Sequence, residues 1–484
     1  MSGDVFGFNS TSNFNSVADA GTFANDEKNI SQSTEKKNTE EKNTTDFYKE
    51  TIFALSSGTG VAGIAVIRLS GPDTLPALRR ITNRQKFKPR YAHYCTLKNP
   101  QTEEVLDQAL VLFFPAPHSF TGEDVAELHI HGGRAVLQSV LKTLSRIKGL
   151  RPASAGEYSK RAVMNGKMDL TQAEGLIDLI HAQTEKQQQQ AFRQMQGALQ
   201  KLYDSWREKL VHDLALMEAY IDFPEEEIPD SVLSQVQANA LSLVRQIRDH
   251  LADEGRGERL REGFRIALVG KPNVGKSSLL NRLTGREAAI VSSTAGTTRD
   301  VIETYLDIKG YPVILADTAG LHDTQEEIEK EGILRAQKQI KEADLVLLLQ
   351  DARTYPETDI TLNPSTTGKT LVVWNKKDLA NALPAEGLFI SAKTGEGCDI
   401  LWKKIESVLE DKMGLTETPA VTRLRYRLQL EECLQNLQNF LNGSVLELQA
   451  EDLRLAARAL GKITGHVEVE ELFDIIFKDF CIGK

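Results

Sequence analysis

The sequence predicts a multidomain protein that combines α/β and all-α parts: an N-terminal α+β domain, a discontinuous helical domain, and an α/β domain inserted into it. Three observations carry this prediction. Short apolar strands punctuated by Gly and Pro occupy residues 63–130, helical periodicity runs over residues 171–252 and returns from residue 423, and a β-branched strand at residues 266–269 enters a glycine loop and a helix. A chain of 484 residues is also too long for one core, so roughly two to four domains are expected.

Changes of pattern along the chain give the expected boundaries. A disordered tail, rich in Ser, Thr, Asn, Glu and Lys, is expected over residues 1–46, and the α+β domain over residues 47–168. The helical domain is expected in two parts, residues 169–262 and 413–484, with the inserted α/β domain over residues 263–412. The helices on both sides of the insert are amphipathic and need a partner, so we expect them to pack together.

The composition is that of an ordinary globular protein, with 40% hydrophobic and 26% charged residues and a net charge of −10. No apolar run reaches the ~18 residues of a membrane span, and the N-terminus lacks the basic-then-apolar order of a signal peptide. We therefore expect a cytoplasmic location without a membrane partner. The acidic net charge does not indicate a general nucleic-acid footprint.

The cysteines are widely spaced and form no C-x-x-C pair, which disfavours disulfides and a structural zinc site. They are Cys95, Cys398, Cys433 and Cys481. Cys481 follows the apolar run at residues 472–480, so it is either a small buried hydrophobe or a reactive thiol.

In the α+β domain we expect strands at residues 63–69, 109–114 and 125–130 and a helix at residues 135–147. His129 and His131 alternate on the third of these strands and share one face, which could be half of a metal site. No third ligand of suitable spacing is evident, so a polar strand face or a ligand pocket is favoured.

Helical periodicity over residues 171–223 begins with a capping-box pattern, Thr171 to Glu174, and contains a glutamine run, Gln187 to Gln190, expected to be an exposed turn. Pro224 and Pro229 break this periodicity. Further helices are expected at residues 232–252, 424–441, 451–460 and 469–480.

The loop after residues 266–269 has the residues of a phosphate cradle, G-x-x-x-x-G-K-S. Gly270 and Gly275 lack the Cβ atoms that would stop backbone N–H groups from surrounding a polyphosphate. Lys276 can reach the outer phosphates, and the Ser277 hydroxyl can bind Mg²⁺ at the start of a helix expected over residues 277–283.

Three later segments select the nucleotide. Asp317-Thr318-Ala319-Gly320 follows a strand-like run, where a carboxylate can hold Mg²⁺ through water and the Gly320 N–H can contact a γ-phosphate. The second, Asn375-Lys376-Lys377-Asp378, ends in a carboxylate that can accept from the N1–H and N2 donors of guanine and would repel adenine N1. The third, Ser391-Ala392-Lys393, would complete the base pocket. Together they predict a Ras-like P-loop GTPase domain.

Motifs from nearly the whole chain after residue 46 make it resemble the tRNA modification GTPases of the MnmE (TrmE) family. The motifs are GIAVIRLSG at residues 63–71, SFTGEDVAELHIHGG at 119–133, AGEYSKRAVMNGKMDLTQAE at 155–174, GKPNVGKSSLLNRL at 270–283, AGTTRD at 295–300, DTAGL at 317–321, NKKD at 375–378 and CIGK at 481–484.

The resemblance implies an N-terminal folate-binding domain that forms a homodimer, and a potassium-stimulated GTPase that works on tRNA with the flavoprotein MnmG in a heterotetramer. The reaction implied is addition of a carboxymethylaminomethyl or aminomethyl group to carbon 5 of the wobble uridine, with a 5-formyl- or methylene-tetrahydrofolate as one-carbon donor. GTP, Mg²⁺ and K⁺ are the other implied ligands.

Site residues follow by position from the same motifs. Folate binding is implied for Arg68, Glu127, Lys167 and Lys484. GTP binding is implied for Asn273, Val274, Gly275, Lys276, Ser277, Ser278, Ser292, Thr297, Thr298, Asp317, Thr318, Ala319, Gly320, Asn375, Lys376, Asp378, Ser391, Ala392 and Lys393. Mg²⁺ would be bound by Ser277 and Thr298, and K⁺ by Asn273, Ser292, Thr294 and Thr297.

Catalysis is implied for Lys276 and Glu329. Leu321 stands where Ras-type GTPases have a water-orienting Gln, and its side chain cannot form hydrogen bonds. Glu329 is expected to orient the water instead, although it could also be one more acid of the solvated run at residues 326–331.

The chain departs from the family pattern at three positions: Ile130 replaces a usual Gly, Ala155 a usual Pro, and His322 a frequent Arg. Two other protein classes share the nucleotide motifs. An Era- or Der-like RNA-binding switch without modification activity would show a KH-like G-x-x-G module after the GTPase domain, and a FeoB-like iron transporter would show membrane spans. The sequence contains neither signal.

Overall fold

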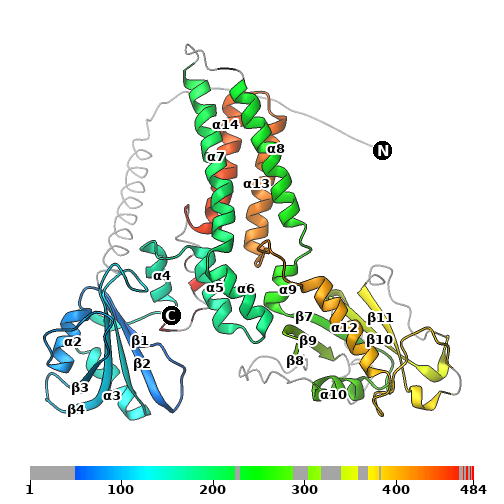
Figure 1. Ribbon diagram of the computed structural model, residues 1–484, viewed down its shortest axis with the longest axis horizontal. Helices are drawn as coiled ribbons and strands as arrows, with labels where there is room; N and C mark the ends of the chain where they lie inside the picture. Colours follow the sequence, from blue (N-terminus) through cyan, green and yellow to red (C-terminus); the bar gives the residue numbers. More distant parts are fainter. Residues whose placement is uncertain are drawn as a thin grey trace, which may run out of the picture. The chain divides into compact units, whose positions relative to one another are not determined.

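Figure 1 shows the computed structural model. The structure describes residues 50–223, 229, 231–286, 303–317, 339–357, 369–380 and 383–467, and six further residues: Phe473, Ile476, Phe477, Phe480, Ile482 and Gly483. By their contacts the residues group into two compact units, Met1–Asn165 with Cys481–Lys484, and Gly166–Phe480. The predicted tail and the helix expected at 469–480 fall largely outside the described residues. None of the helices in the described ranges is long and apolar enough to cross a membrane.

The first unit is built on a six-stranded sheet in the order β3-β4-β5-β2-β1-β6. All neighbours are antiparallel except β1 and β6. The strands are β1 (Thr51–Leu55), β2 (Ala62–Ser70), β3 (His93–Lys98), β4 (Val105–Phe114), β5 (Val125–Gly132) and β6 (Leu150–Pro152), and the helices are α2 (Thr74–Thr82), α3 (Arg134–Leu144) and α4 (Glu157–Met164). The predicted strands are confirmed, because alternating apolar positions such as Ile67, Leu69 and Leu128 form the core.

The segment just before the last residue of the chain packs on β1 of this unit. The Ser56 hydroxyl donates to the Gly483 carbonyl at 2.9 Å, and Ile482 bridges Ala155 in antiparallel fashion. Gly483 has φ +100°, and a Cβ there would lie 2.1 Å from the Leu55 carbonyl oxygen. The close approach of the two backbones therefore requires glycine at this position.

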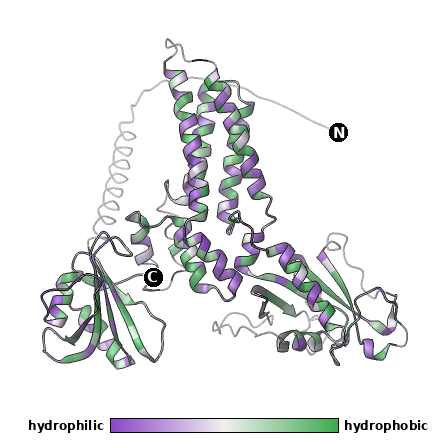
Figure 2. Cartoon of the chain, in the orientation of Figure 1, coloured by the Kyte–Doolittle hydropathy of each residue, from purple (hydrophilic) through white to green (hydrophobic). Residues whose placement is uncertain are grey.

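The helical part of the second unit consists of α5 (Leu170–His181), α6 (Glu185–Met195), α7 (Ala198–Asp222), α8 (Ser231–Leu251), α9 (Arg256–Glu262), α13 (Leu424–Asn442) and α14 (Leu446–Thr464). The long helices α7, α8, α13 and α14 lie side by side (Figure 1) and share one apolar core. In Figure 2 they alternate hydrophobic and hydrophilic colour along their length, as amphipathic helices do. Helices from before and after the α/β domain thus pack together.

The start of α5 differs from the prediction. Asp169 is its N-cap: the carboxylate accepts from the Gln172 N–H at 2.7 Å, and the Gln172 side chain accepts from the Asp169 N–H at 2.9 Å. The predicted box from Thr171 to Glu174 is wrong, because both residues lie inside α5. Glu174 instead forms an ion pair with Arg425 of α13, at 2.5 Å.

The helical periodicity over residues 171–223 belongs to three helices rather than one. Thr184 caps α6, and Gly197, with φ +82°, separates α6 from α7. The glutamine run predicted as one exposed turn lies within α6, where Gln188 is exposed and the other three glutamines are half-buried. The Gln187 and Gln190 side chains donate to carbonyl oxygens within α9, those of Arg261 and Gly257, at 3.0 Å each.

The α/β part contains a five-stranded sheet in the order β11-β10-β7-β9-β8, parallel except for the edge strand β8. Its strands are β7 (Phe264–Val269), β8 (Glu303–Ile308), β9 (Tyr311–Asp317), β10 (Leu345–Asp351) and β11 (Thr370–Asn375), and its helices include α10 (Lys276–Arg286) and α12 (Cys398–Met413). The parallel strands end at one edge of the sheet, where such folds bind ligands.

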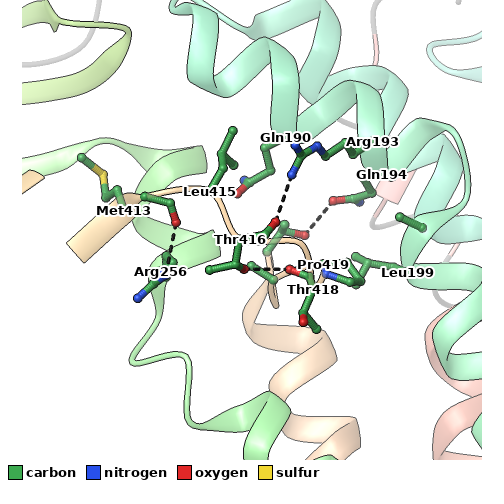
Figure 3. A pocket seen from close by; sticks show the side chains of 14 residues that line it. Gln190, Arg193, Gln194, Leu199, Arg256, Met413, Leu415, Thr416, Thr418 and Pro419 are labelled. Carbon is green, nitrogen blue, oxygen red and sulfur yellow. Dashed lines mark hydrogen bonds between the residues drawn. The ribbon is translucent and has the colours of Figure 1, made fainter. Parts of the chain in front are cut away.

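A small cavity lies where the helical and α/β parts meet, between α6 and the segment after α12 (Figure 3). Arg193 of α6 donates to the Thr416 carbonyl at 3.0 Å, and Thr422 donates to the Gln194 side chain at 2.9 Å. The cavity holds about 30 Å³, which is the space of about one water molecule. It is therefore a packing feature of the junction and not a nucleotide site.

Candidate nucleotide-binding site

Residues 270–275 join β7 to α10 and form the glycine loop of the site. Gly275 has φ +102°, and a Cβ there would lie 2.3 Å from the Asn375 Nδ2 atom. A Cβ on Gly270 would lie 2.7 Å from the Leu349 carbonyl oxygen. Asn273 also has a left-handed backbone, with φ 60°. The loop can follow this path only with glycine at these two positions, which is the arrangement that leaves room for a polyphosphate.

Lys276 starts α10 and is buried, at 9% exposure. Its ammonium donates to the carbonyls of Gly270 at 2.7 Å and Lys271 at 3.1 Å, both in the glycine loop. The positively charged Lys276 ammonium therefore lies at the glycine loop, close to the first N–H groups of α10. Both suit an anionic phosphate. Ser277 and Ser278 are exposed in the first helical turn, where a hydroxyl can reach a cation next to the phosphates.

The base side of the site is joined to this loop through Asn375. Its side chain donates to the Val274 carbonyl at 2.8 Å and accepts from the Ala392 N–H at 2.9 Å, and the residue is 2% exposed. One amide thus connects the glycine loop, the NKKD segment and the Ser391-Ala392-Lys393 segment. The first and last of these three segments are more than a hundred residues apart in the sequence. They contact one another through Asn375, as expected from their positions at strand ends.

Other members of the two base segments differ in exposure. Ser391 is fully buried and its hydroxyl accepts from the Thr394 N–H at 3.1 Å, which fixes the loop. Asp378 and Lys393 are exposed. The Asp378 carboxylate therefore lies at the surface of the short helix η3 (Lys377–Leu379), accessible to a base.

Lys376 has a partner that the sequence analysis missed. Its ammonium lies 2.9 Å from the carboxylate of Asp351, the last residue of β10. A hydrogen bond from Arg353, followed by the one from Lys376, keeps the pKa of Asp351 well below its usual range despite partial burial. A carboxylate directly after the buried run LVLLLQ, at the carboxyl end of a parallel strand, was a signal that could have identified it.

Arg282 of α10 was missed as well. It donates to the carbonyls of Ala392 at 2.8 Å and Lys393 at 2.9 Å, and so ties the phosphate-side helix to the base loop. No sequence pattern pointed to this contact.

Several predicted site residues lie outside the described part of the chain. They are Ser292, Thr294, Thr297, Thr298, Thr318, Ala319, Gly320, His322 and Glu329. Asp317 ends β9, at the same sheet edge as the glycine loop.

A second candidate site lies on the sheet of the first unit. Arg68 of β2 and Glu127 of β5 are directly opposite each other in register and form an ion pair of 3.0 Å. The Arg68 guanidinium also lies over the rings of Phe120 and Tyr158, at 5.3 and 5.8 Å from their centroids. Tyr158 is fully buried beneath this face, whereas Phe120 is partly exposed. A carboxylate, a guanidinium and the Phe120 ring suit a flat heterocycle with hydrogen-bonding edges.

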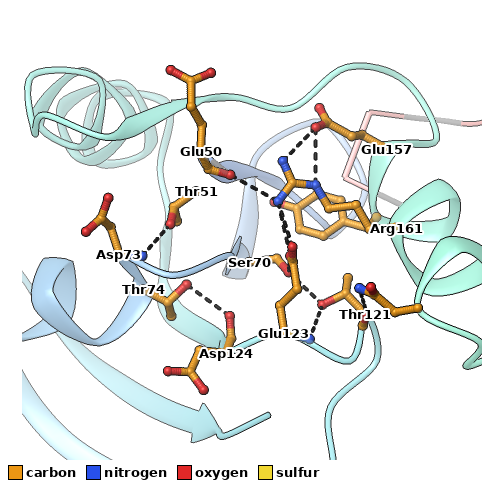
Figure 4. A network of polar contacts seen from close by, with 12 residues as sticks. Glu50, Thr51, Ser70, Asp73, Thr74, Thr121, Glu123, Asp124, Glu157 and Arg161 are labelled. Carbon is orange, nitrogen blue, oxygen red and sulfur yellow. Dashed lines mark hydrogen bonds and ion pairs between the residues drawn. The ribbon is translucent and has the colours of Figure 1, made fainter. Parts of the chain in front are cut away.

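A buried polar network adjoins this face (Figure 4). Arg161 is 1% exposed, and its guanidinium contacts Glu157 at 2.9 Å and Glu123 at 3.1 Å. Glu123 accepts from the Ser70 hydroxyl at 2.6 Å, and Ser70 lies two residues after Arg68 on β2. Burial would raise the pKa of Glu157, but hydrogen bonds from Arg151 and the Ser154 N–H, and the charge of Arg161, lower it below its usual value.

The remaining folate candidates and the departures from the family pattern are placed as follows. Lys167 is exposed and belongs to the second compact unit, and Lys484 lies outside the described residues. Ile130 is 1% exposed in the core, so it lies on the opposite sheet face from Glu127 and does not displace it.

Cys481 also lies outside the described residues, whereas Cys95, Cys398 and Cys433 are buried as free thiols.

The two strand histidines each pair with a carboxylate. His129 lies 3.4 Å from Glu127 and His131 lies 2.7 Å from Asp107. Within the described ranges no three His, Cys, Asp or Glu side chains are grouped so that they could hold a metal ion. Both histidines thus form polar contacts on the strand face that carries Glu127.

Comparison with known proteins gives two family models that match the chain. The model described as the MnmE helical domain matches residues 170–481, and the one described as the GTP-binding protein TrmE N-terminus matches residues 51–167. The tRNA modification GTPase MnmE of Paramagnetospirillum magneticum is 51% identical over 443 residues, 90% of this chain and 100% of that protein. The protein of the same name from Rickettsia akari is 46% identical over 447 residues, again 90% of this chain and 100% of that protein. Among solved structures, a variant of Era from Aquifex aeolicus bound to GDP and AlF4⁻ is 25% identical, with a TM-score of 0.23, and the match covers 36% of this chain and 66% of that one.

Proposed function

The chain belongs to the tRNA modification GTPase MnmE family, and from that membership we propose that it is a potassium-stimulated GTPase that modifies carbon 5 of the wobble uridine of certain tRNAs. Membership of this family supports the general function, which is GTP hydrolysis in tRNA modification. The finer proposal is that the chain acts in the cytoplasm with the flavoprotein MnmG, in a heterotetramer, and adds a carboxymethylaminomethyl or aminomethyl group.

The observation that carries the guanine-nucleotide site is the double hydrogen bond of Asn375. Because its amide binds Val274 and Ala392 at once, the phosphate loop and the base loops have fixed relative positions. Guanine would be recognised by the exposed Asp378 carboxylate, and its plane covered by the stem of Lys376. The glycine loop and Lys276 would bind the phosphates, and Ser277, with Thr298, would bind Mg²⁺, which screens phosphate charge.

Hydrolysis needs a group that orients water, and Leu321 cannot do this. We assign that role to Glu329, whose carboxylate can accept from a water molecule. Asn273, exposed on the glycine loop, would contribute to a K⁺ site with Ser292, Thr294 and Thr297. A monovalent cation there would supply the positive charge that an arginine finger gives other GTPases.

The one-carbon donor is proposed to bind the first unit. Arg68 and Glu127, on neighbouring strands with the Phe120 ring beside them, suit the pteridine of a 5-formyl- or methylene-tetrahydrofolate. Lys167 and Lys484 are kept as folate-binding residues on the strength of the family motifs alone. We also propose that this part of the chain, residues 47–168, forms the homodimer, and that residues 263–412 are the GTPase domain within the helical parts 169–262 and 413–484.

Steady-state GTP hydrolysis by the full chain in K⁺ and in Na⁺ tests the catalytic assignment. We expect K⁺ to stimulate the unmodified protein, Asn273→Ala to abolish only that stimulation, and Glu329→Ala to abolish turnover with GTP binding intact. Glu327→Ala, two positions away in the same acidic run, is the matched control and should retain activity. Equal rates in K⁺ and Na⁺ for the unmodified protein would contradict the cation site.

A further inference from the structure

Asp351 occupies a defined place beside the base segments. It ends β10, and the parallel register pairs it with Asn375 at the end of β11. Its side chain is 13% exposed and its Oδ2 atom lies 2.9 Å from the Nζ of Lys376, itself 24% exposed. Register and side-chain contact therefore both connect Asp351 to the two residues that begin the NKKD segment.

The orientation of the Asp351 carboxylate is fixed from its other side. Arg353 donates to it through Nε at 2.9 Å and Nη2 at 2.6 Å, and the Arg353 N–H donates to Oδ1 at 3.1 Å. The chain then continues to Tyr355, whose ring packs against Trp374 and Phe389 at centroid distances of 5.0 and 5.3 Å. Trp374 directly precedes Asn375, so this aromatic cluster couples the Asp351 segment to the end of β11.

The backbone conformation of Lys376 is restricted, whereas its side chain can adopt many rotamers. Its φ of 65° is left-handed, which is uncommon for a residue with a Cβ and fixes the direction in which the side chain leaves. The four-carbon stem still has many rotamers, and fixing them has an entropic cost. An ion pair formed before the nucleotide binds removes part of that cost from binding.

We propose that Asp351 is a positioning residue for the guanine site, which orients Lys376 for contact with the base without touching the nucleotide itself. The proposal rests on the guanine site assigned above. The Asp351 carboxylate accepts a charge-assisted, directional bond from Lys376. Arg353 contacts the same carboxylate and helps to orient it.

A double-mutant cycle on the full chain tests this, with GDP affinity measured by calorimetry. The variants are Asp351→Asn, Lys376→Ala and the two combined, and Arg353→Gln is measured for comparison. Asparagine keeps an oxygen for the Arg353 N–H, so the local turn is preserved, and thermal unfolding monitors folding. Asp351→Ser, which also keeps a capping oxygen but no charge, is a second variant if the first folds poorly.

We expect Asp351→Asn to weaken GDP binding roughly fivefold in the native background, the effect of about 1 kcal/mol, and less than roughly twofold when Lys376 is already alanine. Arg353→Gln should weaken GDP binding less than Asp351→Asn does, because the contact between Asp351 and Lys376 and the backbone N–H bond from residue 353 remain. Equal losses in both backgrounds, no loss in the native one, or an equal loss in Arg353→Gln would each overturn the inference while the guanine site stands. If Lys376→Ala leaves GDP affinity unchanged, the site assigned in the proposed function fails, and this inference fails with it.

Discussion

The side-chain amide of Asn375 donates a hydrogen bond of 2.8 Å to the backbone carbonyl of Val274, in the middle of the glycine loop. The two residues are 101 positions apart, and the bond is buried. The same amide accepts from Ala392, so the phosphate-binding and base-binding parts of the site depend on one side chain.

Asn375→Ala should therefore disrupt both parts at once. It leaves the Val274 carbonyl and the Ala392 N–H buried without this partner, and each such loss costs about 1–3 kcal/mol. We expect a lower thermal stability and GDP affinity reduced by at least roughly tenfold. Lys377→Ala, in the same segment but in a half-exposed surface ion pair with Glu396, is the control and should change neither quantity much. Native GDP affinity in Asn375→Ala would disprove the bridging role.

Asp378→Asn should change which base is bound. The amide places a donor against the N1–H and N2 donors of guanine, so we expect GTP affinity to fall by about 10- to 100-fold, as for a lost charged hydrogen bond. Xanthosine nucleotides, whose C2 carbonyl accepts, should bind better than they do to the unmodified protein. Competition titrations with GDP and XDP measure both. An unchanged preference for GDP would remove Asp378 from the base pocket.

The end of the chain offers a test of the folate proposal. Gly483→Ala places a Cβ 2.1 Å from the Leu55 carbonyl oxygen, which forces this segment off β1, and deletion of Lys484 alone removes only the terminal cation. We expect both changes to weaken 5-formyltetrahydrofolate binding, measured by calorimetry, and to leave GDP binding unchanged. Folate affinity equal to that of the unmodified protein in both variants would refute a role for this segment.

The helical core predicts a pH dependence. His250 is 7% exposed, its Nε2 lies 3.0 Å from the Tyr203 hydroxyl, and burial lowers its pKa from 6.5 to about 4. Because the unfolded chain binds a proton at higher pH than the folded one, this residue's contribution to stability is complete above pH ~6.5 and is lost as pH falls toward 4.

Between pH 7.5 and 5 this loss amounts to about 2 kcal/mol. Urea unfolding followed by tryptophan fluorescence at the two pH values measures it. His250→Gln keeps an acceptor for Tyr203 and does not titrate, so it should lose about 2 kcal/mol less than the unmodified protein over this interval. Identical pH dependence in the two proteins would show that His250 is not buried in its neutral form.

Local patterns were enough for much of the fold and the site. The apolar run at residues 266–269 and the glycine loop predicted β7 and the turn into α10, and the order of the NKKD and Ser391-Ala392-Lys393 segments predicted that they meet. These signals work because strand, turn and loop chemistry are set by neighbouring residues and because parallel strands end at one edge.

Contacts between distant segments were beyond the sequence. Asp169-x-x-Gln172 and Thr171-x-x-Glu174 are overlapping capping patterns, and the choice between them depends on Glu174, which is buried against Arg425 and Tyr426, about 250 residues away. Gln187 likewise has its partner in Arg261. The sequence places Asp351 at a strand end, but its pairing with Lys376 depends on the register of β10 with β11.

The central claim, that this GTPase serves wobble-uridine modification, is tested most directly by mass spectrometry of tRNA nucleosides from a strain that lacks the protein. We predict that the 5-carboxymethylaminomethyl- or 5-aminomethyl-type uridines disappear, return with the unmodified protein and with Glu327→Ala, and stay absent with Glu329→Ala. Modified uridines at the same level with and without the protein would contradict the claim.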